Sequence, residues 1–210
     1  MSKLLYLSAS PLASRSFSTA VAEAFVESYR AAYPKDAIVR RDLFAEDLPT
    51  FDGHKLTAKY AILNGQPHTA EQRKAWQAIE AVIEDFKSAD KYVLSVPMWN
   101  FGIPYRLKQY FDVIVQPGYT FSFSPSEGFK GLVTGKPIFV VLARGGEYAS
   151  GTEAAALDFQ KPYVEGILRF IGFTDIRSIV VEPTMMAGEE VAQKKRKDAI
   201  ERARQMAREF

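Results

Sequence analysis

The chain has 210 residues, of which 47% are hydrophobic, so it can bury one full core and we expect a single domain over residues 1–210. Its 27 basic and 25 acidic residues leave a formal net charge of +2, which excludes the strong positive field typical of nucleic-acid-binding proteins. It has no cysteine, which excludes disulfides, thiolate catalysis, iron–sulfur clusters and cysteine-based zinc sites and fits a reducing, cytoplasmic location.

Two further kinds of partner are disfavoured by short segments of the chain. The only histidines, His54 and His68, are too few for a typical histidine-rich metal site, so we expect no metal. The longest apolar run, residues 138–143, is far shorter than the roughly 20 residues of a membrane helix, so we expect no membrane partner.

The chain begins with alternating strand and helix patterns. The apolar run Lys3–Leu7 predicts a central strand that is buried on both faces, and a serine-rich loop separates it from a helix over Thr19–Tyr29. Residues 37–43 alternate in polarity and predict a more exposed strand at a sheet edge. Residues 44–70 then form a long connection, with a short helix over 56–63, and connections of this length usually serve function or an interface.

The middle of the chain repeats the alternation. A helix is predicted over residues 71–87 and a strand over Lys91–Ser95. Helical spacing returns from Pro104 to Val115. Residues 118–135 alternate aromatic and hydroxyl side chains between glycines, which predicts a small hairpin or excursion.

The last part of the chain adds two more units. Residues 137–143 give the clearest buried strand of the sequence, and a helix is predicted over 154–171. A strand over 176–182 and a helix over 189–208 follow. Five strands that are each followed by a helix predict an α/β fold with an open parallel sheet and helices on both faces. The leading arrangement is the flavodoxin-like order 2-1-3-4-5, whose ligand crevice lies outside the carboxyl ends of strands 1, 3 and 4.

The segment Val96–Pro104 interrupts the pattern between the third strand and its helix. Pro97 ends the strand hydrogen bonding and Pro104 suits the first turn of a helix, so residues 98–103 are predicted to form a rigid loop whose backbone N–H groups are not committed to a sheet. The loop carries Met98, Trp99, Asn100 and Phe101. It is either a hydrophobic lid over the helix or a platform for a flat aromatic ligand.

The loop after the first strand offers Ser10, Ser16 and Ser18 at the start of a helix. A helix N-terminus concentrates unpaired N–H groups and partial positive charge, so hydroxyls there suit a phosphate monoester. Ordinary N-capping by one serine is the alternative, although one cap does not use three hydroxyls. The loop lacks the glycines of the dinucleotide fingerprint and of the P-loop.

The loop after the fourth strand is Arg144–Gly145–Gly146. Its two glycines let the backbone approach a ligand closely and tolerate positive φ, and a simple turn is the alternative. The position of the pair at the predicted ligand edge favours binding. Together the three loops predict a site for a mononucleotide with a flat heterocycle.

Three motifs carry a resemblance to a known family. They are Ser10 with Ser16–Phe17–Ser18, Pro97–Met98–Trp99–Asn100–Phe101 followed by Leu107–Asp112, and Arg144–Gly145–Gly146. They resemble the motifs of the FMN-dependent NADH:quinone oxidoreductase and azoreductase family, and the similarity covers essentially the whole chain. Two positions depart from the family pattern. Trp99 stands where the family often has Tyr, and Ala143 stands where it often has Ser, which removes a hydroxyl near the flavin.

The resemblance implies a homodimer with FMN at the interface. It assigns Ser10, Ser16, Phe17 and Ser18 to the phosphate, Met98, Trp99, Asn100 and Phe101 to the isoalloxazine ring, and Gly145 and Gly146 to its pyrimidine edge; Pro97 and Arg144 complete the cofactor-binding set. The Asn100 amide and the Phe101 N–H are expected to stabilise negative charge on the O4/N5 side. Because FMN performs the chemistry, no separate catalytic side chain is expected.

The expected reaction is ping-pong. NADH or NADPH delivers hydride to FMN and leaves, and a quinone, an aromatic azo compound or a nitroaromatic then accepts two electrons. The candidates for the acceptor pocket are aromatic: Phe121, Phe123, Tyr148, Phe159, Phe170 and Phe173. One alternative is a flavodoxin-type electron carrier, although such carriers are usually strongly acidic and this chain is not. The other is an interaction or regulatory module that docks through residues 44–70.

Overall fold

A parallel sheet of five strands forms the centre of the protein in the computed structural model, which describes residues 1–63, 66–67, 69–148, 151 and 153–210. The strands are β1 (Lys3–Ser8), β2 (Ala37–Asp42), β3 (Lys91–Pro97), β6 (Ile138–Ala143) and β7 (Ile176–Val181). Their order is β2-β1-β3-β6-β7, which is the predicted order 2-1-3-4-5 once the sheet strands are numbered along the chain. The predicted flavodoxin-like sheet is therefore confirmed.

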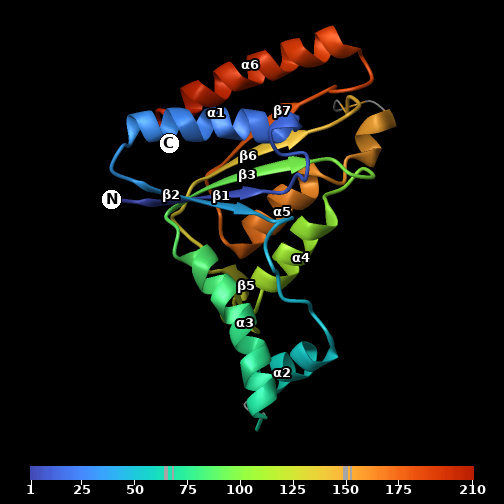
Figure 1. Cartoon of the computed structure of the whole chain (residues 1–210). Helices are drawn as coiled ribbons and strands as arrows, with labels where there is room; N and C mark the ends of the chain where they lie inside the picture. The colour runs from blue at the N-terminus through green and yellow to red at the C-terminus, as the bar shows by residue number, and fades with distance from the viewer. Residues whose placement is uncertain (64–65, 68, 149–150, 152) are drawn as a thin grey trace.

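Helices cover both faces of the sheet (Figure 1). One layer consists of α1 (Phe17–Ala32) and α6 (Glu189–Ala207), which pack against each other. The opposite layer contains α3 (Ala70–Lys87), α4 (Tyr105–Ile114) and α5 (Lys161–Ile171). The short α2 (Gly53–Leu63) packs on α3 away from the sheet, where a short helix was predicted.

The alternation of side chains along the strands divides the core into two halves. In β1, Leu4 and Tyr6 pack with α1 and α6, whereas Leu5 and Leu7 pack with the helices of the opposite layer. Every residue of β6 is buried, as expected for a strand that is covered on both faces. No residue of β2 is fully buried, which confirms its predicted place at the sheet edge.

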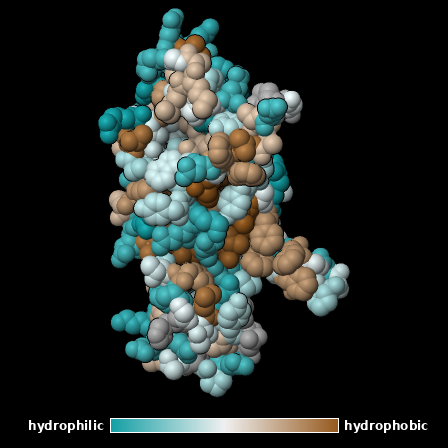
Figure 2. All heavy atoms as spheres, turned by 90° about the vertical axis from the view of Figure 1, so that its right-hand side faces the viewer, coloured by the Kyte–Doolittle hydropathy of each residue, from teal (hydrophilic) through white to brown (hydrophobic). Residues whose placement is uncertain are grey.

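The excursion predicted between the third and fourth sheet strands is an antiparallel hairpin. It consists of β4 (Phe121–Ser124) and β5 (Gly128–Gly131). The Phe170 ring of α5 supports it, with ring centroids 4.8 Å from Phe121 and 5.6 Å from Phe129. Figure 2 views the molecule towards the carboxyl ends of the strands and shows an arm with hydrophobic side chains projecting at the lower right.

The predicted helix over residues 154–171 is wrong in its first part. Residues Glu153–Leu157 form a 3₁₀ helix, and α5 begins only at Lys161. Pro162 explains the break, because a proline has no N–H and its ring clashes with the carbonyl of the preceding turn unless it lies in the first turn of a helix. Asp158, Phe159 and Gln160 are therefore free to make contacts outside a helix.

The end of the long connection is set by a helix cap. Thr69 and Gln72 form a capping box at the start of α3, in which each side chain accepts the other's backbone N–H. Residues 64, 65 and 68 of the connection lie outside the described residues. Within the part of the chain that is described, no helix is long and apolar enough to cross a membrane.

Candidate functional site

A cavity of about 410 Å³, here called the inner cavity, lies at the carboxyl ends of the sheet strands. Its lining comes from the loops that follow β1, β3, β6 and β7: Ser10, Pro11, Leu12, Arg15, Ser16, Phe17, Pro97, Met98, Trp99, Ala143, Gly145, Thr184 and Met185. This is the edge at which the strand order predicts the ligand crevice. Figure 2 shows the same face, with hydrophobic side chains across its centre.

The loop after β1 brings its serines to the N-terminus of α1. Ser16 is the N-cap, because its Oγ accepts the Thr19 N–H at 3.4 Å and lies 3.1 Å from the Ser18 Oγ. Ser10, Ser16 and Ser18 are all buried, and only the first two line the inner cavity. Ordinary capping therefore accounts for Ser16, while Ser10 contacts the cavity without any role in the cap.

The first turn of α1 carries donors that fit a phosphate. The N–H groups of Phe17 and Ser18 have no partner among the described residues, and the turn contains no acidic side chain. The partial positive charge of the helix end is therefore not neutralised, and Arg15 adds a full positive charge to the cavity lining. A phosphate monoester fits this set of donors.

The loop after β3 is a tight turn. Trp99 and Gly102 exchange backbone hydrogen bonds of 3.1 and 2.9 Å, and the Met98 N–H donates to the Ala143 carbonyl at 2.7 Å. The prediction that these N–H groups are not committed to the sheet is therefore wrong for Met98 and holds for Trp99 and Gly102, which bond to each other. The turn pairs with itself, and Met98 extends the ladder between β3 and β6 by one bond.

Asn100 and Phe101 occupy the tip of this turn at positive φ angles of 47° and 67°. This is the geometry of a type I′ turn, which Asn tolerates and which strains Phe. Their N–H groups have no partner in the described structure, so these two donors are unpaired as well as outside the sheet. Neither side chain lines the inner cavity, and the Phe101 ring meets Tyr148 edge-on at 6.4 Å.

Gly145 and Gly146 approach the loop that follows β7. The Gly145 carbonyl accepts the N–H groups of Met185 and Met186 at 3.1 and 3.0 Å, and a Cβ at Gly146 would lie 3.0 Å from the Met186 Sδ. Neither glycine has a positive φ, so their tolerance of that conformation is not used here, and their close approach to a ligand stays a prediction. Gly145 lines the inner cavity and Gly146 does not.

Arg144 is buried among polar partners and does not line the inner cavity. It is 2% exposed, and its guanidinium lies 2.8 Å from the Asp158 carboxylate and 3.3 Å from that of Glu182. Its Nε donates to the Gln160 Oε1 at 3.1 Å. The side chain that was expected to contact the cofactor is thus already committed to partners within the protein.

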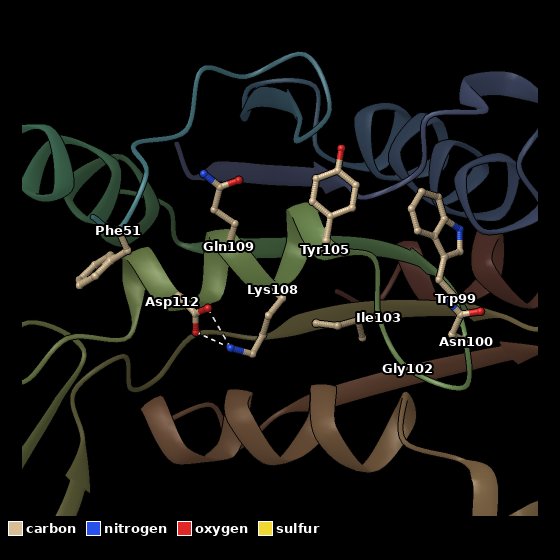
Figure 3. Close-up of a pocket in the computed structure, with 9 residues that line it drawn as sticks. All are labelled: Phe51, Trp99, Asn100, Gly102, Ile103, Tyr105, Lys108, Gln109 and Asp112. Atoms are coloured by element: carbon tan, nitrogen blue, oxygen red, sulfur yellow. Dashed lines mark hydrogen bonds and ion pairs between the residues drawn. The ribbon is translucent and has the colours of Figure 1, made fainter. Parts of the chain in front are cut away.

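A second cavity of about 610 Å³, here called the outer cavity, runs along α4 on the other side of the Trp99–Gly102 turn (Figure 3). Its lining consists of Phe51, Trp99, Asn100, Gly102, Ile103, Tyr105, Lys108, Gln109 and Asp112. Trp99 lines both cavities. In Figure 3 the rings of Trp99 and Tyr105 stand side by side, and their centroids are 6.3 Å apart.

The charges of the outer cavity cancel. Lys108 Nζ lies 2.7 Å from the Asp112 carboxylate, and Figure 3 shows this pair on the side of α4 away from the Tyr105 ring. The hydrogen bond to Asp112 raises the pKa of Lys108 above its ordinary value, so Lys108 stays charged at neutral pH. An aromatic lining with a neutralised charge pair suits a flat, uncharged ligand.

Sequence reasoning missed the contribution of the loop after β7. Thr184 and Met185 line the inner cavity, and Thr184 is held there because its N–H and Oγ1 both donate to the Arg144 carbonyl. The predicted sheet order could have indicated this loop, since β7 is parallel to β6 and therefore ends at the same edge of the sheet. Pro11 and Leu12 of the first loop were also missed, because their side chains belong to no motif.

The lining of the inner cavity fits a flavin mononucleotide better than a metal. Met98, Trp99 and Met185 supply polarisable and aromatic surface for a flat ring, at the same cavity as the unpaired helix N-terminus. Within the described residues no group of three or more His, Cys, Asp or Glu side chains could hold a metal ion. His68 lies outside the described residues.

Comparison with known proteins agrees with this fit. A family model described as a flavodoxin-like fold matches residues 2–207. An FMN-dependent NADH:quinone oxidoreductase from Nitratidesulfovibrio vulgaris (strain DP4) is 53% identical over 210 residues, which are 100% of both chains. An FMN-dependent NADH:quinone oxidoreductase 3 from Pseudomonas fluorescens is 40% identical, and the match covers 100% of this chain and 98% of that protein.

Two solved structures share the fold throughout. The azoreductase from Bacillus anthracis strain Sterne has a TM-score of 0.91 at 32% identity, with 100% of both chains covered. The FMN-dependent NADH-azoreductase from Bacillus anthracis strain Ames Ancestor, solved in complex with FMN, has a TM-score of 0.86 at 30% identity and covers 99% of this chain and 100% of its own. The chain therefore belongs to the FMN-dependent NADH:quinone oxidoreductase family, among proteins of flavodoxin-like fold.

Proposed function

We propose that this protein binds FMN and transfers two electrons from NADH or NADPH to quinones, aromatic azo compounds and nitroaromatics by a ping-pong mechanism in the cytoplasm. The observation that carries the proposal is the inner cavity, at which an unpaired helix N-terminus, the Trp99 ring and Gly145 meet at one sheet edge. Membership of the family supports the same activity.

The phosphate of FMN binds at the first turn of α1. The free N–H groups of Phe17 and Ser18 donate to its oxygens, and the partial positive charge of the helix end favours the dianion. Ser10 and Ser16 contribute hydroxyls from the cavity lining, and Arg15 contributes a positive charge.

The isoalloxazine ring lies along Pro97, Met98 and Trp99. FMN, when bound, supplies the redox chemistry, in which hydride from the nicotinamide is taken up and two electrons pass to the acceptor. The Phe101 N–H, which has no partner in the described chain, and the Asn100 amide donate towards the O4/N5 side and stabilise negative charge there. Ala143 offers only van der Waals contact in place of a hydroxyl.

The active unit in this proposal is a homodimer with FMN at the interface. Several large aromatic side chains are more than half exposed: Tyr105, Phe123, Phe129 and Phe159. A second copy that covers them removes apolar surface from water and closes an aromatic pocket for the acceptor. Phe173 has no part in that pocket, because it is buried in the core at 1% exposure.

An anaerobic titration tests the function. The purified protein should be yellow, lose its colour with NADH or NADPH, and regain it when a benzoquinone or an azo dye is added. A protein that stays colourless and does not bind added FMN would contradict the proposal. Bound FMN that neither nicotinamide reduces would instead indicate an electron carrier.

A further inference from the structure

Three consecutive residues, Asp158, Phe159 and Gln160, connect the two loops that border the inner cavity. The Phe159 N–H donates to the Phe101 carbonyl at the tip of the Trp99–Gly102 turn, at 3.0 Å. The Gln160 side-chain amide donates to the Val96 carbonyl on β3 at 3.1 Å. The segment is therefore fixed to β3 and to the turn that follows it.

The same segment holds the loop after β6 through Arg144. Asp158 and Gln160 bind two different nitrogens of the guanidinium, and the third nitrogen lies near Glu182 after β7. Gln160 thus accepts from Arg144 with its oxygen and donates to β3 with its nitrogen. We call Arg144, Asp158, Gln160 and Glu182 the Arg144 network. It joins the ends of β3, β6 and β7 to the start of α5.

Arg144 lies in the chain between two residues that line the inner cavity. Its neighbours Ala143 and Gly145 both line the inner cavity, whereas the Arg144 side chain is buried on the other side of the loop. A movement of the guanidinium therefore moves the cavity wall directly. A buried ion network is weak support for stability alone, because the cost of desolvating its charges offsets much of their attraction.

We propose that Arg144 is a positioning residue. Through Asp158 and Gln160 it sets the separation between the Trp99–Gly102 turn and the Ala143–Gly146 loop, and so holds the free N–H of Phe101 at the flavin edge. The proposal rests on the proposed function, since it takes FMN to be the ligand of the inner cavity. A planar guanidinium that hydrogen-bonds Gln160 and Glu182 through two nitrogens and forms an ion pair with Asp158 through the third fixes this geometry, and a lysine ammonium cannot reproduce it.

The test compares Arg144→Lys with a matched control, Arg177→Lys. Arg177 also binds a carboxylate, that of Asp175, but it lies at the opposite end of β7. Both proteins are purified, stripped of flavin and titrated with FMN, and the midpoint potential of the reconstituted protein is measured. Circular dichroism and thermal melting establish that each variant is folded.

Arg144→Lys should weaken binding of oxidised FMN about tenfold, and of reduced FMN more than that, so the midpoint potential falls. The reduced ring carries more negative charge, so its binding is weakened more than that of the oxidised ring when the Phe101 N–H moves away. Arg177→Lys should bind FMN with wild-type affinity and potential. Gln160→Leu should resemble Arg144→Lys, and the double variant should be no weaker than the worse single variant, because both act through one network.

Two results would overturn the positioning role. One is a folded Arg144→Lys protein with wild-type affinity and potential, and the other is an equal loss of affinity for oxidised and reduced FMN, which would reflect stability alone. If Arg144→Lys does not fold, either of the same two results obtained with Gln160→Leu would overturn the positioning role. A wild-type protein that does not bind FMN would overturn the proposed function, and it is recognised before any variant is compared.

Discussion

Trp99 is the residue at which the two cavities meet. It is 38% exposed, and its ring lies 5.6 Å from Phe44 and 6.3 Å from Tyr105, measured between centroids. Because Trp99 lines both cavities, the size of its ring affects the space in each of them. We therefore expect a change of Trp99 to affect the choice of acceptor as well as the binding of the proposed flavin.

Trp99→Tyr should leave the affinity for FMN within about threefold, because a phenol keeps the aromatic plane. The smaller ring leaves more room in the cavities that Trp99 lines, so kcat/KM for a bulky azo dye should rise relative to that for a small benzoquinone. Tyr105→Phe is the control, since it keeps the neighbouring ring and should leave the ratio unchanged. Steady-state rates with both acceptors measure the ratio, and an unchanged ratio in Trp99→Tyr would contradict the assignment.

The residues of the site differ in how far sequence could predict them. Ser10, Trp99 and Gly145 line the inner cavity and belong to recognisable motifs. The orientation of Arg144 could not be read from its motif, because it depends on Asp158 and Glu182, which are distant in the sequence. Burial and ion pairing are properties of the folded chain, so a motif that names a residue does not give its partners.

At the scale of elements, the β4–β5 hairpin packs against the C-terminal end of α5. Gly131 makes this possible, because a Cβ there would lie 2.3 Å from the backbone nitrogen of Gly172. Gly131→Ala should therefore lower the free energy of unfolding by about 1–3 kcal/mol through overpacking. Gly166→Ala, inside α5 with open space around it, should raise that energy by about 0.5–1 kcal/mol. Urea unfolding measures both, and equal effects of the two changes would contradict this account.

Glu165 links α5 to β7. The Ser178 hydroxyl donates to its carboxylate at 2.8 Å, and Lys161 and Arg169 pair with it at 3.0 and 2.9 Å. Burial acts to raise the pKa of Glu165, but these hydrogen bonds outweigh it and hold that pKa below its ordinary value. A carboxyl whose pKa is lowered in the folded state stabilises the protein above its unfolded pKa and loses this contribution as the pH falls through the folded value.

Glu165→Gln should therefore cost about 1–3 kcal/mol of unfolding free energy at pH 7, and this difference from wild type should shrink at pH values below the ordinary pKa of 4.5. Urea unfolding of both proteins at pH 7 and in the acid range gives the two differences. A loss of unfolding free energy that is the same at every pH would show that the packing of the side chain, and not the charge of Glu165, causes the loss.

The start of α5 shows why element boundaries were harder to predict than elements. Apolar residues at helical spacing continue on both sides of Pro162, so periodicity alone extended the helix back to residue 154. The proline ends that helix in the structure, and the freed segment becomes the connection to Arg144. The backbone constraint of one residue decided the boundary.

At the scale of the whole molecule, the sheet order followed from chain rules alone. Short crossovers, right-handed connections and a fully apolar β6 leave few other arrangements. The same rules locate the cavity at the carboxyl edge of the sheet. They do not give the shape of the outer surface, where the hairpin and the 3₁₀ helix before α5 carry exposed aromatic and leucine side chains.

The proposed homodimer can be tested at the hairpin. Phe123 is 60% exposed and contacts the neighbouring ring of Phe129 at 4.9 Å between centroids, so a polar replacement should leave the fold intact. In a two-fold symmetric interface each substitution occurs twice. Loss of two buried phenylalanines costs about 3–6 kcal/mol, which raises the dimer dissociation constant more than about a hundredfold.

Phe123→Lys should therefore sediment as a monomer at micromolar concentration, while Val191→Lys, on the exposed side of α6, should keep the wild-type sedimentation coefficient. Because FMN is proposed to lie at the interface, the monomer should also retain less flavin and reduce quinone more slowly with NADH. Sedimentation velocity, flavin content and quinone reduction are measured on the same preparations. A Phe123→Lys protein that remains dimeric would place the interface elsewhere, and a monomer with full flavin content and activity would contradict an interfacial site.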